Sequence, residues 1–202
     1  MISPKIIHNL LSDVECKILC TFIQQCAAQK LPIKVYSNSS RRTEVSYRDM
    51  ASGSFRYEAV NVVQRARQRC FTNALILYGK KPLYIEFTLL AGNYCGDSHI
   101  LHADNKRYDT TINTWVPNHT PDRVFSGLLY LNQGGGLDFQ GGNIKFPQYD
   151  LTIIPAPGTA VLFPSDENFL HEVEPVISGA RYSIASWYTA NVTMNEEALV
   201  RC

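Results

Sequence analysis

The sequence has no apolar run long enough to cross a membrane, and residues 1–7 lack the hydrophobic stretch of a secretory signal. Net charge is only +1 at pH 7, which gives no electrostatic signal for nucleic acid or an anionic membrane. The six cysteines form no Cys-x-x-Cys pair and have no zinc-like spacing. We therefore expect a cytoplasmic protein with reduced thiols and with neither a nucleic-acid nor a membrane partner.

Length and composition fit an ordinary globular chain. The 202 residues are 45% hydrophobic and 18% charged, which is enough apolar material for one sizeable core. We expect a single domain over 1–202, in which 1–80 provide helical support and 81–190 form a β-rich core.

Two helices are predicted before residue 80. Ser12-x-x-Glu15 is a capping box ahead of an apolar helical period, which predicts a helix over 13–29. A second apolar stripe predicts a helix over 56–78 that ends at Gly79. Between the helices we expect short strands or loop, around 34–36 and 44–46.

From residue 83 the apolar period shortens to that of strands. A turn is expected at 91–94 and a long polar loop at 105–122. The pattern predicts an α+β fold, mainly β, built as a two-sheet jelly roll with supporting N-terminal helices. The expected strands, in addition to the one that carries His102, are 83–90, 125–132, 143–146, 151–154, 158–163, 173–176 and 181–189.

The residues most indicative of chemistry are His102 and Asp104, in Ser98-His-Ile-Leu-His-Ala-Asp-Asn105. In an extended strand, side chains two positions apart point to the same face, so this imidazole and carboxylate can bind one metal ion. His171 is the best candidate for a third ligand. Two histidines and one carboxylate on one face of the ion are the ligand set of non-haem Fe(II) oxygenases.

A group that binds the carboxylate of a ligand is predicted ten residues after His171, in a segment with the sequence pattern of a strand. Arg181 and Ser183 would share one face of this strand. A guanidinium holds a carboxylate in a bidentate fork, and a nearby hydroxyl adds a further bond. This is what a 2-oxoglutarate site requires.

Other residues have two possible roles. Tyr84 and Tyr94 are either donors to 2-oxoglutarate or core aromatics, and Asn105 either orients Asp104 or caps a turn, with a substrate contact also open to it. Trp115, in the loop, is the best candidate for contact with substrate. We expect His99 to face away from the metal, because it lies an odd number of residues from His102, and we expect Trp187 to be a core residue.

These residues lie in blocks that resemble the 2-oxoglutarate- and Fe(II)-dependent dioxygenases. The likeness covers about 82–190 and is greatest to the prolyl hydroxylase branch, in particular the catalytic domain of leprecan-type prolyl 3-hydroxylases. Lys106 stands where those enzymes commonly carry a cysteine. The matching blocks are Ser98-His-x-x-His-Ala-Asp-Asn105, Ser126-x-Leu-Leu-Tyr-Leu-Asn132, Gly141-Gly142, Gly158 to Phe163, Glu167-Asn-x-x-His-x-Val173, Gly179-x-Arg181 and Trp187-Tyr-Thr189.

The resemblance implies a double-stranded β-helix that binds Fe(II) through His102, Asp104 and His171, and 2-oxoglutarate through Arg181. It further implies O₂ as oxidant, ascorbate as reductant, and hydroxylation of a C–H bond, with release of succinate and CO₂. The substrate would be a prolyl residue in a peptide or protein.

Three alternatives keep this fold. One is a hydroxylase of a free amino acid or small metabolite, another is a nucleic-acid demethylase, and the third is a non-enzymatic, cupin-like binding module. Near-neutral charge argues against the demethylase.

Overall fold

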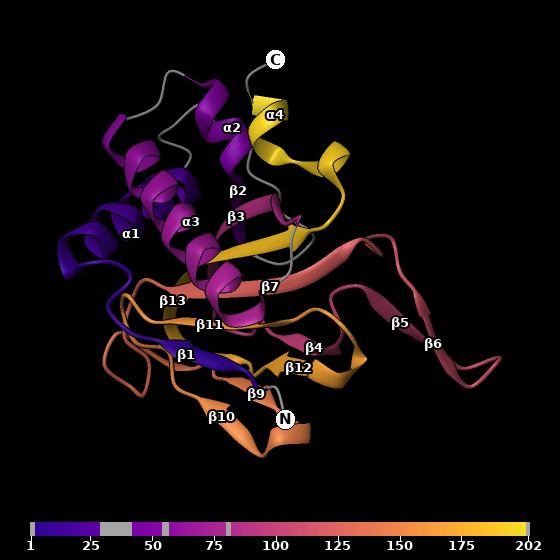
Figure 1. Ribbon diagram of the computed structural model, residues 1–202. Helices are drawn as coiled ribbons and strands as arrows, with labels where there is room; N and C mark the ends of the chain where they lie inside the picture. The colour runs from indigo at the N-terminus through magenta and orange to yellow at the C-terminus, as the bar shows by residue number, and fades with distance from the viewer. Residues whose placement is uncertain (1–2, 29–41, 54–56, 80–81, 201–202) are drawn as a thin grey trace.

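The computed structural model describes residues 3–28, 42–53, 57–79 and 82–200 (Figure 1). Its helices are α1 (Asp13–Ala27), α2 (Tyr47–Ser52), α3 (Tyr57–Tyr78) and α4 (Glu196–Val200), with short 3-10 turns at Pro147–Tyr149, Glu167–Phe169 and Val192–Met194. Its strands are β1 (Lys5–Ile7), β2 (Thr43–Ser46), β3 (Tyr84–Tyr94), β4 (His99–His102), β5 (Lys106–Asp109), β6 (Thr114–Pro117), β7 (Arg123–Tyr130), β8 (Phe139–Gly141), β9 (Ile144–Phe146), β10 (Leu151–Ile153), β11 (Ala160–Pro164), β12 (His171–Val173) and β13 (Val176–Thr189).

The larger sheet has the strand order β1-β11-β7-β13-β3-β2, with β8 paired to one end of β13. Helices α1 and α3 cover one of its faces (Figure 1). The apolar sides of these helices and that face of the sheet form one core, in which Leu19, Ile23, Val63 and Leu90 are fully buried. Because helices and sheet share this core, the N-terminal helices support the sheet, as predicted.

The smaller sheet has the order β10-β9-β12-β4 and packs against the other face of the larger one. Phe146, Val161 and Phe163 lie in a second core between the two sheets. All strand pairs are antiparallel. This is the two-sheet jelly roll that the strand pattern predicts.

The capping box at the start of α1 is present as predicted. The Ser12 hydroxyl accepts from the Glu15 backbone amide, and the Glu15 carboxylate accepts from the Ser12 backbone amide at 3.0 Å. The predicted strand 44–46 corresponds to β2, whereas the strand expected at 34–36 lies outside the described residues. None of the described helices combines the length and apolarity that a membrane crossing needs.

Two local predictions are wrong. The turn expected at 91–94 is the second half of β3. All four residues pair with β13 on one side, and Ala91 and Gly92 also pair with β2 on the other. The loop expected at 105–122 contains a hairpin of β5 and β6 that projects from the sheets (Figure 1). Tyr108 and Trp115 pair across this hairpin with ring centroids 5.4 Å apart, a cross-strand contact that stabilises it.

Candidate active site

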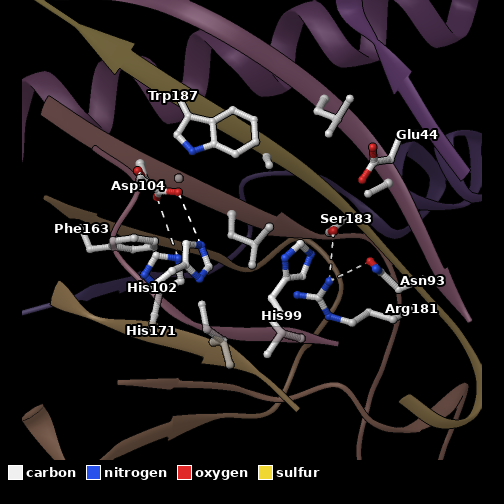
Figure 2. Close-up of a pocket in the computed structure, with 18 residues that line it drawn as sticks. Glu44, Asn93, His99, His102, Asp104, Phe163, His171, Arg181, Ser183 and Trp187 are labelled. Atoms are coloured by element: carbon white, nitrogen blue, oxygen red, sulfur yellow. Dashed lines mark hydrogen bonds and ion pairs between the residues drawn. The ribbon is translucent and has the colours of Figure 1, made fainter. Parts of the chain in front are cut away.

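A cavity lies between the two sheets, and its two ends carry different polar groups (Figure 2). One end has His102, Asp104 and His171, and the other has Asn93, Arg181 and Ser183. The walls between the ends are largely apolar and include Leu89, Leu128, Ile144, Phe163, Val173 and Trp187.

The structure brings His102, Asp104 and His171 together. His102 ends β4 and His171 begins β12, and the two residues are direct partners across the smaller sheet. Asp104 follows β4 and places its Oδ1 3.7 Å from His102 Nε2 and its Oδ2 3.9 Å from His171 Nε2. One ligand atom from each residue lies within 4.8 Å of the other two, so the three can hold one metal ion.

Backbone carbonyls orient both imidazoles. The Nδ1 atom of His102 lies 2.7 Å from the Ile100 carbonyl oxygen, and that of His171 lies 3.1 Å from the Phe169 carbonyl oxygen. A carbonyl only accepts, so Nδ1 carries the proton and donates in each ring. The unprotonated Nε2 then faces the cluster, as a metal-binding imidazole requires.

The environment of Asp104 keeps its carboxylate ionised. Burial alone would raise the pKa of Asp104, but the neighbouring His102 and His171 imidazoles and the Ser126 hydroxyl outweigh that effect and lower it. Burial lowers the pKa of His171, which favours its neutral form. An anionic oxygen and two imidazole nitrogens suit a divalent transition metal.

Arg181, at the other end, is a buried cation. Its side chain is 2% exposed, and its Nη1 donates to Asn93 Oδ1 and Ser183 Oγ, each at 3.3 Å. Its Nε and Nη2 have no hydrogen-bond partner, and it pairs with no acid among the described residues. Burial lowers the pKa of Arg181, which shows how poorly this charge is solvated. A bound carboxylate would satisfy both nitrogens.

Tyr130 is a buried polar group beside Arg181 that the sequence argument missed; it belongs to the core between the sheets and is not among the residues that line the cavity. It is fully buried, its hydroxyl has no hydrogen-bond partner in the described chain, and the Arg181 guanidinium carbon lies 5.2 Å from its ring centroid. Burial raises the pKa of Tyr130 to about 12, so the hydroxyl keeps its proton and can donate. Only its position in the Leu-Leu-Tyr-Leu-Asn block could have indicated it.

Tyr84 and Tyr94 do not line the cavity, which corrects their expected role as donors to 2-oxoglutarate. Side chains alternate along β3, so Ala91 and Asn93 face the cavity and Tyr94 faces the helices. The Tyr94 hydroxyl bonds to Thr43 Oγ1 at 3.1 Å. Tyr84 starts β3, roughly 23 Å before Ala91 along an extended strand.

His99 and Trp187 line the cavity, contrary to prediction. On β4, His99 pairs with Val173 and His102 with His171, so β4 has one residue more than β12 between these pairs. This bulge changes the alternation and turns His99 to the same side as His102. Burial, followed by the nearby Arg42, lowers the pKa of His99 to about 3, so its imidazole is neutral.

Asn105 and Trp115 do not line the cavity either. The Asn105 side chain donates to the Arg123 carbonyl oxygen at 2.8 Å and so joins the two ends of the hairpin segment. Of the roles considered for Asn105, this is closest to capping a turn, and a substrate contact within the cavity is not supported. Trp115 is half-buried on the hairpin against Tyr108.

Fold and site together define a class: jelly-roll oxygenases that use a non-haem metal. The family model of the 2OG-Fe(II) oxygenase superfamily matches residues 90–189. The chain belongs to this superfamily and is a 2-oxoglutarate-dependent non-haem iron dioxygenase. No curated protein sequence matches it.

Solved structures of the same fold include two prolyl hydroxylases. A viral collagen prolyl hydroxylase from Paramecium bursaria Chlorella virus-1, in complex with 2-oxoglutarate, has a TM-score of 0.67 and 18% identity, over 93% of this chain and 96% of that one. A prolyl hydroxylase from Trichoplax adhaerens, in complex with a peptide of hypoxia-inducible factor, has a TM-score of 0.66 and 20% identity, over 93% and 83%.

A third similar structure is HygX from Streptomyces hygroscopicus, with nickel, 2-oxoglutarate and hygromycin B bound. It has a TM-score of 0.66 and 12% identity, over 94% of this chain and 83% of that one. The three structures confirm the double-stranded β-helix. They do not single out the leprecan-type prolyl 3-hydroxylases, and that part of the resemblance stays a prediction.

Proposed function

We propose that this dioxygenase hydroxylates a prolyl residue of a peptide or protein, with His102, Asp104 and His171 as the Fe(II) ligands. Arg181 and Ser183, together with Tyr130, hold the distal carboxylate of 2-oxoglutarate. Bound iron and 2-oxoglutarate supply the oxidising chemistry, in which O₂ is consumed, succinate and CO₂ are released, and a C–H bond becomes C–OH.

A single observation carries this proposal: a buried guanidinium, two of whose nitrogens have no hydrogen-bond partner in the described part of the chain, shares a cavity with a His-Asp-His cluster. A buried charge without a partner is costly, so it indicates a ligand that completes the pairing. The residues at the two ends fit a molecule with a carboxylate at one end and a metal-chelating group at the other, as in 2-oxoglutarate.

The protein itself contributes to the reaction through the cavity walls and through the hydrogen bonds at Nδ1 of His102 and His171. Phe163 and Leu128 present apolar surface beside the cluster, which disfavours water there and would protect a reactive centre. The carbonyls of Ile100 and Phe169 hold the imidazoles in the metal-binding tautomer. The substrate carbon must then lie against apolar walls, which suits a neutral aliphatic ring such as that of proline.

The β5–β6 hairpin supports a polypeptide substrate. Its aromatic pair Tyr108 and Trp115, with Tyr108 45% exposed, offers the kind of surface on which proline-rich chains pack. The peptide held by the Trichoplax enzyme agrees with this choice. HygX, which holds the small molecule hygromycin B, supports a second candidate function: hydroxylation of a free amino acid or other small metabolite.

The test compares succinate release from 2-oxoglutarate with Fe(II), ascorbate and O₂ in the presence of proline-containing peptides or free amino acids. The proposal expects peptides to increase succinate release and to gain one oxygen atom on proline. Stimulation by free amino acids alone would favour the second candidate, and no 2-oxoglutarate turnover under any condition would refute both.

The domain organisation, the cellular location and the substrate class of the enzyme are also proposals. We infer that 1–202 act as one catalytic domain, because helices and larger sheet share a core. We infer a cytoplasmic location, supported by five free cysteines in the described chain. Net charge of +1 supports a substrate other than nucleic acid.

A further inference from the structure

The backbone of Asp104 is fixed by hydrogen bonds on both sides. Its amide donates to the Ser165 carbonyl oxygen at 3.0 Å, while its own carbonyl oxygen accepts from Asn118 Nδ2 at 3.1 Å and from Thr120 Oγ1 at 2.9 Å. These partners follow β11 and β6. The main chain of this residue therefore cannot turn freely, and only rotation of its side chain remains to be controlled.

A chain of two hydroxyls controls that rotation. Ser126 Oγ lies 2.5 Å from Asp104 Oδ2, and Ser165 Oγ lies 2.8 Å from Ser126 Oγ. An ionised carboxylate only accepts, so Ser126 donates its single proton to Asp104, and Ser165 must donate to Ser126. Both serines are buried, at 3% and 2% exposure, so water does not compete for these bonds.

The two oxygens of Asp104 are therefore different. Both face the cluster, Oδ1 at 3.7 Å from His102 Nε2 and Oδ2 at 3.9 Å from His171 Nε2, but Oδ2 accepts from Ser126, whereas Oδ1 accepts no hydrogen bond from any residue that the structure describes. To bind a metal through both oxygens, the carboxylate must turn both of them equally toward the ion, and the Ser126 bond to Oδ2 resists that rotation. A carboxylate that binds through one oxygen keeps this bond.

We propose that Ser126, backed by Ser165, is a positioning residue that restricts Asp104 to metal binding through a single oxygen. This inference rests on the proposed function, because it takes His102, Asp104 and His171 as the ligands. Three single-atom ligands on one face of a six-coordinate ion leave about three positions open, and chelating 2-oxoglutarate and O₂ need all of them. A second Asp104 oxygen on the metal would remove one.

The test uses Mn²⁺ as a paramagnetic probe on the full chain without 2-oxoglutarate, and counts metal-bound water from the relaxation of water protons. Ser126→Ala should lose about one bound water per Mn²⁺ relative to wild type, because Asp104 is freed to bind through both oxygens. Ser126→Thr keeps the hydroxyl and should match wild type. Ser186→Ala, which removes a buried serine from the same sheet outside the cavity, is the matched control and should also match wild type.

The outcomes separate the two proposals. Failure of wild type to bind Mn²⁺ would refute the ligand assignment itself. Equal hydration of wild type and Ser126→Ala would overturn the positioning role alone, as would loss of Mn²⁺ binding in a folded Ser126→Ala, because the hydroxyl would then be needed to retain the ligand. If Ser126→Ala does not fold, Ser165→Ala is measured instead, and it should lose bound water in the same direction or the inference fails.

Discussion

At the scale of single residues, Arg181 is the most informative side chain. Proteins rarely bury a guanidinium without an acid, since removing the charge from water is expensive. Asn93 and Ser183 satisfy only Nη1, and Tyr130 adds a second unpartnered group close by. An anionic ligand would complete this cluster, and such a ligand would connect it to the proposed metal ligands across the cavity.

Replacing Arg181 with alanine should weaken 2-oxoglutarate binding. The lost charge-assisted pair is worth about 1.5–3 kcal/mol, which corresponds to roughly a 10- to 150-fold increase in Kd. Calorimetric titration of the Mn²⁺-loaded protein with 2-oxoglutarate measures it. Arg69→Ala, at an exposed arginine on α3, should leave the Kd unchanged. An unaltered Kd in Arg181→Ala would show that the anchor is elsewhere.

The metal ligands and the anchor could be proposed from sequence because few residue types can do their chemistry. Their partners could not, because each depends on contacts between segments far apart in the chain. Ser126 meets Asp104 only through the pairing of strands, and Asn93 reaches Arg181 across the β3–β13 register. The spacing from His102 predicts the wrong face for His99, because a bulge is a property of two paired strands and is not visible in one.

At the scale of elements, the β5–β6 hairpin projects from the sheets and is the proposed contact for a polypeptide substrate. Replacing Tyr108 and Trp115 together with alanine should raise the KM for a peptide substrate roughly tenfold or more, as expected for loss of aromatic anchors at a binding surface. The 2-oxoglutarate turnover without peptide should be unchanged, because neither ring lines the cavity. A peptide KM equal to that of wild type would remove the hairpin from the substrate site.

The capping box of α1 makes the stability of this helix depend on pH. Burial would raise the pKa of Glu15, but the Ser12 amide, Arg65 and Arg69 outweigh it and lower the pKa from 4.5 to about 2. A carboxyl whose pKa is lower in the folded state stabilises the fold above its unfolded pKa, and that contribution is lost as pH falls toward the folded pKa.

Glu15→Gln should therefore lower the Tm at pH 7, and the difference from wild type should shrink as pH falls from about 4.5 toward about 2. Thermal melts over this pH range measure the difference. Glu58→Gln, at an exposed glutamate on α3, is the control and should change the Tm little at any pH. A difference for Glu15→Gln that stays constant with pH would contradict the pKa assignment.

At the scale of the whole molecule, the jelly roll and its helical support follow from patterns that are local in the chain. The capping box, the helical stripes and the short alternating runs each reflect burial of one face. The continuation of β3 through 91–94 does not, because two neighbouring strands overrule the local turn preference of Gly92 and Asn93. The hairpin in 105–122 likewise depends on one cross-strand aromatic pair in an otherwise polar segment.

The central claim is that one cavity holds Fe(II) at His102, Asp104 and His171 and 2-oxoglutarate at Arg181. Anaerobic titration of the Fe(II)-loaded protein with 2-oxoglutarate tests it, because a 2-oxo acid that chelates Fe(II) gives a visible charge-transfer absorption. We predict that this absorption saturates at one 2-oxoglutarate per chain, is absent from His171→Ala, and requires a much higher concentration in Arg181→Ala. Absence of the absorption in wild type, or its full retention in His171→Ala, would contradict the account.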